Sequence, residues 1–425
     1  MISELDGAGR GFVCGRIARI DSERIVLADE SGVAELRLGC CPSSIGEGDI
    51  VEVAFKDGRA EAVRLLAKAA RPPSGNPDFV RFNEELKAAL RLRARITAEI
   101  RAFFREEGFL EVETPSLVPS PGLEPHLRSF ATHYTPDGNG SGGRRVFLPA
   151  SPEYHMKRML AAGFEKIFQI CRSYRNGESF DLHNPEFTML EWYRAYADSA
   201  AIMADLERLG GRLAQGITPR RIIEFRGGRI DFAPPWHTVT VREAFRRWAG
   251  IELPPENDAE AFRTAARDAG VANITDDDTW EDVFYKVFLS VIEPKLGTDK
   301  PLFLTEYPAS MAALARCKES DPTVAERFEL FIGGIEIANG FTELNDPAEQ
   351  RRRFIAEQQH RQQAGAPEHP IDERLLEALS IGMPPSGGVA VGVDRLVMIL
   401  AGRERIEDVI AFPFSHDFPG AADRE

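Results

Sequence analysis

One stretch of sequence decides the fold of most of this chain: Arg172-Ser-Tyr-Arg-Asn-Gly-Glu-Ser-Phe-Asp-Leu-His-Asn-Pro-Glu-Phe-Thr-Met-Leu-Glu-Trp-Tyr193. Two strands joined by a loop are expected here, and side chains on a strand alternate between its two faces. Arg175 can then meet a phosphate through two parallel hydrogen bonds, and His183 can donate to another phosphate oxygen. Phe187 offers a flat surface for a purine. The stretch therefore predicts a nucleotide site on a β-hairpin.

A second segment, Glu329 to Glu343, carries spaced carboxylates. A Gly-Gly pair between its two β-rich runs predicts a two-residue hairpin. In that register Phe331 lies opposite Glu336. Glu329 then lies opposite Ala338, and Glu329 and Glu336 share one face of the sheet. Because two carboxylates on one face repel each other unless a cation lies between them, this pair predicts a Mg²⁺ site that carries nucleotide phosphates.

A third segment, Gly388-Val-Ala-Val-Gly-Val-Asp-Arg395, predicts a strand of small residues that leads into a helix. Glycines let a ligand approach the backbone closely, and Arg395 can then reach a phosphate. Arginines for a triphosphate, carboxylates for a metal and a flat face for adenine together indicate an enzyme that activates a carboxylate as an acyl-adenylate. ATP is the expected co-substrate and Mg²⁺ the expected cofactor.

Together these segments resemble the class II aminoacyl-tRNA synthetases over residues 80–415. Gly108–Pro115 is similar to motif 1 of that family, Phe168–Glu191 to motif 2 and Gly388–Arg395 to motif 3. The resemblance implies an α+β catalytic domain, in which helices flank an antiparallel sheet, and a homodimer formed through motif 1. Three more stretches are similar to the lysine-specific branch of the family: Ser151–Arg158, His183–Tyr193 and Asn339–Asp346.

Two families compete within this branch, the lysyl-tRNA synthetases and the elongation factor P lysine ligases. The amino-acid sequences of these motifs are closer to those of the ligases, and Ala390 stands where the synthetases usually carry glycine. The resemblance therefore implies transfer of lysine or (R)-β-lysine from an adenylate to a lysine side chain of elongation factor P, with tRNA not expected as the acceptor. A lysyl-tRNA synthetase with a shortened anticodon-binding domain and a non-catalytic amino-acid or nucleotide sensor stay as alternatives.

The resemblance also implies roles for individual residues. The expected catalytic residues are Arg175, which would bridge the substrate carboxylate and the α-phosphate, and Arg395, which would hold the γ-phosphate. The expected substrate-binding residues are Ser151, Pro152, Glu153, Glu191, Tyr193, Asn339, Glu343 and Ala390. The expected ATP-binding residues are Arg175, Asn176, Gly177, Glu178, His183, Asn184, Phe187, Glu336, Ile337, Gly392 and Arg395. The expected metal ligands are Glu329 and Glu336.

Motif 2 departs from the family at Gly177. The family usually reads Arg-Asn-Glu, with the glutamate near adenine, whereas this chain reads Arg175-Asn-Gly-Glu178. Either Glu178 takes the place of that glutamate after a small backbone shift, or Gly177 contributes only its backbone.

The chain is expected to hold a small OB-like β-barrel at residues 1–71, a linker at 72–80 and the catalytic domain at 81–425. Residues 1–65 contain 8 Lys and Arg against 12 Asp and Glu, whereas a groove for nucleic acid needs basic and stacking side chains. The barrel is therefore expected to serve packing or protein contact. Short runs separated by turn residues predict its five strands: Phe12–Ile20, Ile25–Ala28, Ala34–Leu38, Ile50–Phe55 and Ala60–Leu66.

The remaining segments give weaker expectations. Apolar residues recur at helical spacing from Phe79 to Glu107, which predicts one amphipathic helix. Phe109–Pro115 is expected to be a strand and Gly138–Gly143 a flexible loop. Residues 199–300 carry no readable motif and are expected to be scaffold and insertion.

Composition limits the class of protein. The 425 residues carry a net charge of −15, which argues against broad non-specific binding to nucleic acid. No apolar run reaches the roughly 18 residues of a membrane span, and the N-terminus lacks the pattern of a signal peptide. Five cysteines without metal-ligand spacing are expected to be reduced thiols. The expected location is therefore cytoplasmic.

Overall fold

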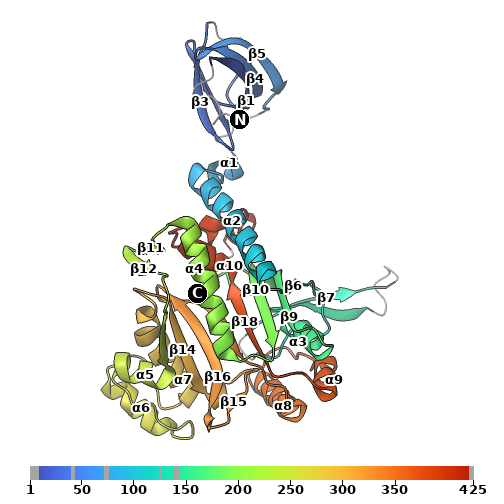
Figure 1. Cartoon of the computed structure of the whole chain (residues 1–425), viewed down its shortest axis with the longest axis vertical. Helices are drawn as coiled ribbons and strands as arrows, with labels where there is room; N and C mark the ends of the chain where they lie inside the picture. Colours follow the sequence, from blue (N-terminus) through green and yellow to red (C-terminus); the bar gives the residue numbers. More distant parts are fainter. Residues whose placement is uncertain (1–8, 40–43, 71–75, 125–126, 137–142, 421–425) are drawn as a thin grey trace. The chain divides into compact units, whose positions relative to one another are not determined.

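The computed structural model describes residues 9–39, 44–70, 76–124, 127–136 and 143–420. The chain divides into two compact units, Met1–Leu90 and Arg91–Glu425 (Figure 1). Residues 72–75 of the expected linker, and the expected loop at Gly138–Gly143 apart from its last residue, lie outside the described residues. The domain boundaries read from the sequence stay a prediction.

In the first unit, five strands close into a barrel with the order β1-β2-β3-β5-β4. Apolar side chains that alternate along the strands fill its interior, such as Val13 and Ile17 on one strand and Val51 and Val53 on another. Each expected strand is present within a few residues, so the small barrel is confirmed, while its OB type stays a prediction. The strands are β1 (Arg10–Ile20), β2 (Arg24–Asp29), β3 (Gly32–Arg37), β4 (Ile50–Lys56) and β5 (Arg59–Ala67).

A break divides the helix predicted for residues 79–107. The chain forms α1 (Pro77–Arg81) and then α2 (Glu84–Glu106). Between them, the side-chain oxygen of Asn83 accepts a hydrogen bond from the backbone N–H of Leu86 at 2.9 Å. A side chain that accepts from a free N–H in this way starts a new helix. The apolar spacing continues across the break, so the periodicity alone could not show it.

The second unit is built on a nine-stranded sheet. Eight strands follow the order β13-β14-β16-β17-β18-β10-β9-β6, and β15 pairs with β16. Neighbours are antiparallel except for the β13–β14 and β6–β9 pairs, which confirms the expected α+β architecture. The strands are β6 (Leu110–Glu111), β9 (Lys166–Tyr174), β10 (Glu186–Ala195), β13 (His237–Thr240), β14 (Leu302–Pro308), β15 (Cys317–Lys318), β16 (Asp321–Ile332), β17 (Ile335–Thr342) and β18 (Ser386–Gly392).

The strand expected at Phe109–Pro115 was wrong in length, because β6 covers only two residues. Its pairing with β9 ends at the hydrogen bond from the N–H of Val112 to the oxygen of Phe168 at 2.9 Å. Pro115 has no N–H with which to extend the pairing.

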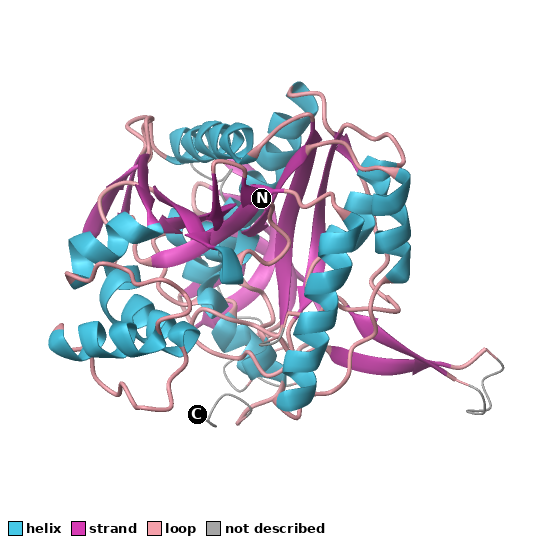
Figure 2. Cartoon of the chain, turned by 90° about the horizontal axis from the view of Figure 1, so that it is seen from below, coloured by secondary structure: helices cyan, strands magenta, loops and turns pink. Residues whose placement is uncertain are grey.

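Helices lie on both sides of the sheet (Figure 2). Two small hairpins, β7 (Phe130–Tyr134) with β8 (Arg144–Leu148) and β11 (Ile222–Phe225) with β12 (Gly228–Asp231), stand apart from it. The helices after α2 are α3 (Glu153–Ala161), α4 (Ser199–Ile217), α5 (Val241–Ala244), α6 (Ala259–Asp268), α7 (Trp280–Val287), α8 (Pro347–Gln363), α9 (Glu373–Ile381), α10 (Val393–Leu400) and α11 (Phe414–Asp417).

The two faces of β10 separate packing from the candidate site. The ring of Trp192 lies 5.0 Å from that of Phe104 on α2, and both side chains are fully buried. Phe187 and Met189 point the other way and line a cavity. Because side chains alternate along a strand, Glu191 belongs to the cavity face. One strand thus anchors the helix layer and carries predicted site residues.

Candidate active site

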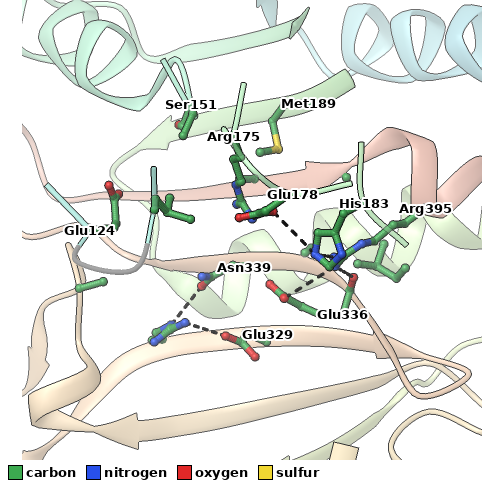
Figure 3. A pocket seen from close by; sticks show the side chains of 18 of the residues that line it. Glu124, Ser151, Arg175, Glu178, His183, Met189, Glu329, Glu336, Asn339 and Arg395 are labelled. Carbon is green, nitrogen blue, oxygen red and sulfur yellow. Dashed lines mark hydrogen bonds and ion pairs between the residues drawn. The ribbon is translucent and has the colours of Figure 1, made fainter. Parts of the chain in front are cut away.

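A cavity of about 660 Å³ lies over this second face of the sheet (Figure 3). Its volume is in the range of pockets that bind small molecules. Its walls come from the β9–β10 connection, β16, β17, β18, α8, α10 and residues 281–293. The expected site residues that line it are Ser151, Glu153, Arg175, Glu178, His183, Asn184, Phe187, Glu329, Glu336, Ile337, Asn339, Ala390, Gly392 and Arg395.

Arg395 is fixed at one end of the cavity by three hydrogen bonds. Its guanidinium donates to the backbone oxygens of Leu182 at 3.2 Å and Glu336 at 2.8 Å, and to Nε2 of His183 at 2.6 Å. Since arginine has no acceptor, Nε2 of His183 carries no proton. Burial, together with Arg395 and Arg175, lowers the pKa of His183 to about 4. His183 is therefore neutral near pH 7, and the arginines supply the positive charge of this end.

Arg175 lies in the middle of the cavity, between Ser151 and the pair of His183 and Arg395 (Figure 3). Its guanidinium lies 5.3 Å from the centre of the Phe187 ring. Its Nε atom is buried and has no hydrogen-bond partner in the described part of the chain. An arginine with an unused N–H donor in a cavity can bind an anionic group of a ligand, such as a carboxylate or a phosphate.

The turn before Glu178 accounts for the departure of motif 2. Gly177 has a φ of +88°, a backbone conformation that residues with a side chain rarely adopt. Glu178 follows and lines the cavity, with a carboxylate oxygen 3.6 Å from the guanidinium of Arg175. This arrangement favours the first alternative, in which Glu178 takes the place of the family's glutamate. That role stays a prediction.

Glu329 and Glu336 both face the cavity, as expected, but the register between their strands was predicted incorrectly. Glu329 lies opposite Asn339 rather than Ala338. The pairing next to the turn is as expected, and the shift arises at Ile337, an extra residue that forms a β-bulge. A two-residue turn fixes the register only as far as the first bulge, which the sequence did not show.

Two neighbours hold Glu329 in place. The hydroxyl of Tyr307 donates to it at 2.5 Å and the guanidinium of Arg327 at 2.6 Å. Burial and repulsion from Glu336 raise the pKa of Glu329 to about 7. Such a pair fits Mg²⁺, which is usually bound by one or two carboxylates plus substrate phosphates. In the described ranges, no group of three or more His, Cys, Asp and Glu side chains is arranged to hold a metal by itself.

A network of polar side chains lies behind Ser151. The Ser151 hydroxyl donates to one oxygen of Glu191 at 2.5 Å, and the Tyr193 hydroxyl donates to the other at 2.8 Å. Glu191 is buried, and burial together with the nearby Glu153 carboxylate raises its pKa to about 8. A buried carboxyl ionises readily only beside a cation, so this wall suits an ammonium group.

Lys157 on α3 extends the network to Glu343. Its Nζ lies 2.5 Å from an oxygen of Glu153 and 2.5 Å from an oxygen of Glu343. Burial by itself would lower the pKa of Lys157, but the two carboxylates raise the pKa above its usual value. Burial raises the pKa of Glu343, and the ammonium of Lys157 opposes that rise. The sequence analysis missed Lys157, although its position four residues after Glu153 on a helix was a signal.

Some expected site residues are engaged in hydrogen bonds of the fold, and others do not line the cavity. Asn184 lines the cavity, but its amide is engaged in the fold, donating to the oxygen of Glu186 at 2.5 Å and accepting from the N–H of Phe414 at 2.8 Å. The site roles of all these residues stay predictions. The expected residues that do not line the cavity are Pro152, Asn176, Gly177, Glu191, Tyr193 and Glu343.

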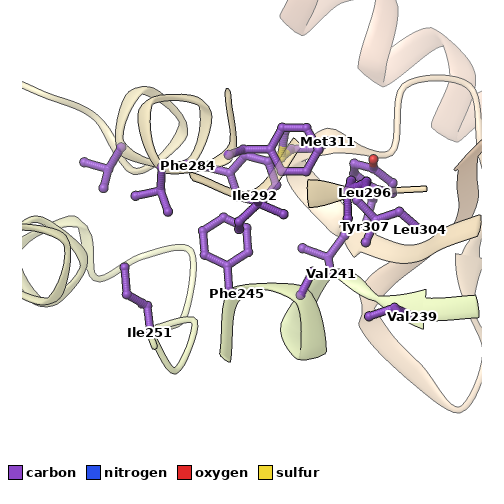
Figure 4. Close-up of a cluster of buried hydrophobic side chains, with 14 of the residues drawn as sticks. Val239, Val241, Phe245, Ile251, Phe284, Ile292, Leu296, Leu304, Tyr307 and Met311 are labelled. Carbon is purple, nitrogen blue, oxygen red and sulfur yellow. The ribbon is translucent and has the colours of Figure 1, made fainter. Parts of the chain in front are cut away.

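Residues 281–293 supply a wall that the sequence analysis did not predict. The segment packs on a hydrophobic cluster in which Phe284 and Ile292 lie with Phe245 and Leu304 (Figure 4). Residues 199–300 are thus partly scaffold, as expected, and partly cavity wall. Apolar periodicity marks only the buried side of such helices, so no sequence signal marked the side that faces the cavity. The lining residues are Glu281, Tyr285, Phe288, Leu289 and Glu293.

Glu124 and Glu357 are two further carboxyls in the cavity wall that the sequence analysis missed. Burial, with repulsion from Glu153, raises the pKa of Glu124. Burial, with repulsion from Glu124, raises the pKa of Glu357 to about 8. Glu124 lies on the side of Arg175 away from His183 (Figure 3). The cavity therefore has a second acidic region apart from Glu329 and Glu336.

Comparison with known proteins gives the family. Residues 78–416 match the model described as tRNA synthetases class II (D, K and N). This chain belongs to that family. The match covers the catalytic unit with its three motifs and begins after the barrel.

Three similar proteins carry the name elongation factor P--(R)-beta-lysine ligase. The protein from Salmonella arizonae is 43% identical over 75% of this chain and 93% of its own length. That from Edwardsiella ictaluri is 42% identical over 76% and 94%, and that from Erwinia tasmaniensis is 43% identical over 76% and 94%. The resemblance to class II synthetases and to these ligases is thereby confirmed. No helix in the described residues is long and apolar enough to cross a membrane.

Proposed function

We propose that this protein activates (R)-β-lysine or lysine with ATP as an adenylate and transfers it to a lysine side chain of elongation factor P. One observation carries the proposal. A single cavity holds Arg175 between a carboxylate-rich wall and the pair of His183 and Arg395. An amino acid whose carboxylate faces the α-phosphate of ATP presents its groups in the same order, with ammonium groups at one end and the β- and γ-phosphates at the other. The names of the three relatives support the choice of amino acid and acceptor.

Adenylate formation needs positioning rather than an enzyme nucleophile. The substrate carboxylate attacks the α-phosphorus, a C–O–P linkage forms, and pyrophosphate leaves with the electrons of the broken P–O bond. Arg175 would hold the attacking carboxylate and the α-phosphate, while Arg395 and His183 would hold the γ-phosphate. Fixed donors aimed at developing charge lower the barrier without reorganisation.

The carboxylate pair of Glu329 and Glu336 fits the same proposal. Glu329 and Glu336 would hold Mg²⁺, which, when bound, neutralises phosphate charge during transfer. Glu178 and Phe187 would contact adenine.

At the other end, Glu153 would hold the amino group nearest the carboxylate. Glu343, Tyr193 and Glu191 would hold the distal ammonium. Ala390 pairs with Glu191 on one neighbouring strand and with Asn339 on the other. Its methyl group therefore narrows the cavity floor, where it would influence the choice between α- and β-amino acids.

The second acidic region supports a protein lysine as the acceptor. A lysine ammonium must lose a proton before its nitrogen attacks the adenylate carbonyl, and the bond to AMP then breaks. Glu357, whose pKa is raised to about 8, would accept that proton in its ionised form, which becomes more populated as the pH rises. A tRNA hydroxyl carries no charge for these carboxylates to attract. The relatives and this region favour the ligase over a lysyl-tRNA synthetase or a sensor.

A homodimer formed through Gly108–Pro115 and a cytoplasmic location belong to the same proposal. Leu110 in this segment and Leu117 just after it are exposed apolar side chains. Cys14, Cys171 and Cys317 are free thiols, as is usual in a reducing compartment. Sedimentation should show a dimer, and a fully active monomer would overturn this part.

The test offers both acceptors at once. The enzyme is incubated with ATP, Mg²⁺ and labelled (R)-β-lysine or lysine, together with elongation factor P and bulk tRNA. Label on elongation factor P, more from β-lysine than from lysine, is the expected result. Label on tRNA would support the lysyl-tRNA synthetase instead. Absence of amino-acid-dependent ATP–pyrophosphate exchange would support the sensor.

A further inference from the structure

Lys157 joins the two ends of the proposed amino-acid site. It is only 1% exposed, and its Nζ lies 2.5 Å from Glu153 Oε1 and 2.5 Å from Glu343 Oε2. Glu153 lies one helical turn before it on α3, whereas Glu343 follows β17, almost two hundred residues later in the chain. The Nζ also lies 5.6 Å from the centre of the Phe341 ring, on β17. A single ammonium therefore fixes two carboxylates that come from distant segments.

Each of these carboxylates keeps one oxygen unused. Glu343 Oε1 is buried and has no hydrogen-bond partner in the described residues. It lies against Gly388, where an added Cβ would collide with Oε1 and with the ring of Tyr193. Glu153 gives Oε1 to Lys157, and within the described ranges its Oε2 accepts no hydrogen bond. A buried carboxylate oxygen without a donor is costly, and a ligand ammonium would relieve that cost.

We propose that Lys157 is a positioning residue for the amino-acid substrate, whose ammonium turns one oxygen each of Glu153 and Glu343 toward the two amino groups of that substrate. The inference rests on the proposed function, because it needs a substrate with two amino groups. Lys157 contacts no reacting atom and acts through the two glutamates. Its positive charge also opposes the rise that burial causes in the pKa of Glu343.

The charged groups around Lys157 determine what happens when its ammonium is removed. The groups that face its ammonium are Glu153 from α3 and Glu343 after β17, with Glu191 and Tyr193 of β10 in the same network. Without the ammonium, nothing opposes burial and repulsion from Glu153, so the pKa of Glu343 rises further and its protonated form is favoured over a wider pH range. An incoming ammonium must then displace that proton. The penalty is largest at low pH and shrinks as rising pH ionises the carboxyl.

The test uses ATP–pyrophosphate exchange with (R)-β-lysine and with lysine, on the full-length wild type, Lys157→Met and Lys318→Met. Lys318 forms a similar ion pair, with Glu306 at 2.5 Å, outside the cavity lining. For Lys157→Met we expect KM for the amino acid to rise at least about tenfold near pH 7, with KM for ATP within about twofold of wild type. The rise should shrink toward about pH 9. The Lys318→Met protein should behave as wild type throughout.

The outcomes separate the two proposals. Wild type without exchange on either amino acid overturns the proposed function and this inference together. Active wild type with an unchanged amino-acid KM in Lys157→Met overturns the inference alone. So does an equal rise in both KM values, or a ratio of KM values that does not vary with pH, because a merely structural role predicts either. If Lys157→Met does not fold, Lys157→Gln, which keeps a donor without the charge, is expected to show the same pH dependence.

Discussion

The charged side chains at the two ends of the candidate site differ in how deeply they are buried and in how they are paired. At the proposed amine end, behind the cavity wall, the charged side chains are buried and paired with each other, and Lys157 and Glu343 are 1% and 0% exposed. At the proposed phosphate end the side chains of Glu336 and Arg395 are 39% and 19% exposed, and their carboxylate–guanidinium distance is 3.8 Å. Burying a charge is costly unless it is paired. Under the proposed function, the protein would carry its own counter-ion where the ligand is a small amino acid, and it holds Arg395 mainly by backbone oxygens where the ligand would be a large polyanion.

This difference has a consequence for specificity. A buried, internally balanced end rejects a substrate that lacks the right charges, because unpaired buried groups would remain. The more open end, under the proposed function, would tolerate variation in phosphate geometry and leave room for a metal. Substitutions should therefore separate into those that change the KM of the amino acid and those that change the KM of ATP. Four predictions test this separation, beginning with the residue that belongs to both ends.

Arg175→Ala should have the largest effect, because Arg175 lies between the two ends and would stabilise charge as the carboxylate attacks. We expect kcat for ATP–pyrophosphate exchange to fall about 10³-fold. Arg172→Ala is the matched control, since its side chain is 53% exposed and pairs with Glu186. A rise in only one of the two KM values, with kcat unchanged, would show that Arg175 contacts only the amino acid or only ATP.

Gly388→Ala should break the amine end alone. The added Cβ would collide with the Tyr193 ring and Glu343 Oε1, so KM for the amino acid should rise about 10- to 100-fold. KM for ATP should stay within about twofold. Gly216→Ala is the control, because nothing lies within 4 Å of a Cβ added there. Equal changes in both KM values would contradict the separation.

His183→Asn should alter how ATP binding depends on pH. The pKa of His183 is held at about 4 by burial and two arginines, and bound phosphate would raise it. A group whose pKa rises on binding makes binding tighter as the pH falls toward its free pKa. The ratio of KM for ATP in His183→Asn to that in wild type should therefore grow as the pH falls from about 7 to about 5. A constant ratio would argue against contact between His183 and phosphate.

Asp49→Asn should have the smallest effect on the site, since Asp49 belongs to the barrel. Its carboxylate accepts hydrogen bonds from Lys68 and from the N–H groups of Ala69 and Gly46. These bonds, led by the one from Lys68, lower its pKa to about 2. The stabilisation is present above the unfolded pKa of about 3.9 and is lost as the pH falls through about 2. Thermal unfolding should report a less stable barrel, while both KM values stay unchanged.

Much of the fold was predictable because its signals are local. The five barrel strands follow turn residues and alternating polarity, and the β9–β10 hairpin follows from a strand pattern on both sides of a loop. The signals failed where a longer-range contact decides. Asn83 interrupts a helix whose apolar spacing continues, and the bulge at Ile337 shifts a register that the Gly-Gly turn had set correctly next to it.

The sequence by itself determined the family and most of the residues around the cavity, because spacing within a motif is preserved along one or two strands. Only the tertiary structure decided how the charges of the cavity balance. Lys157 meets Glu343 across almost two hundred residues, residues 281–293 close a wall, and Glu124 and Glu357 form a second acidic region. The state of such groups depends on burial and on neighbours brought from distant segments, and neither is written in the local pattern of the chain.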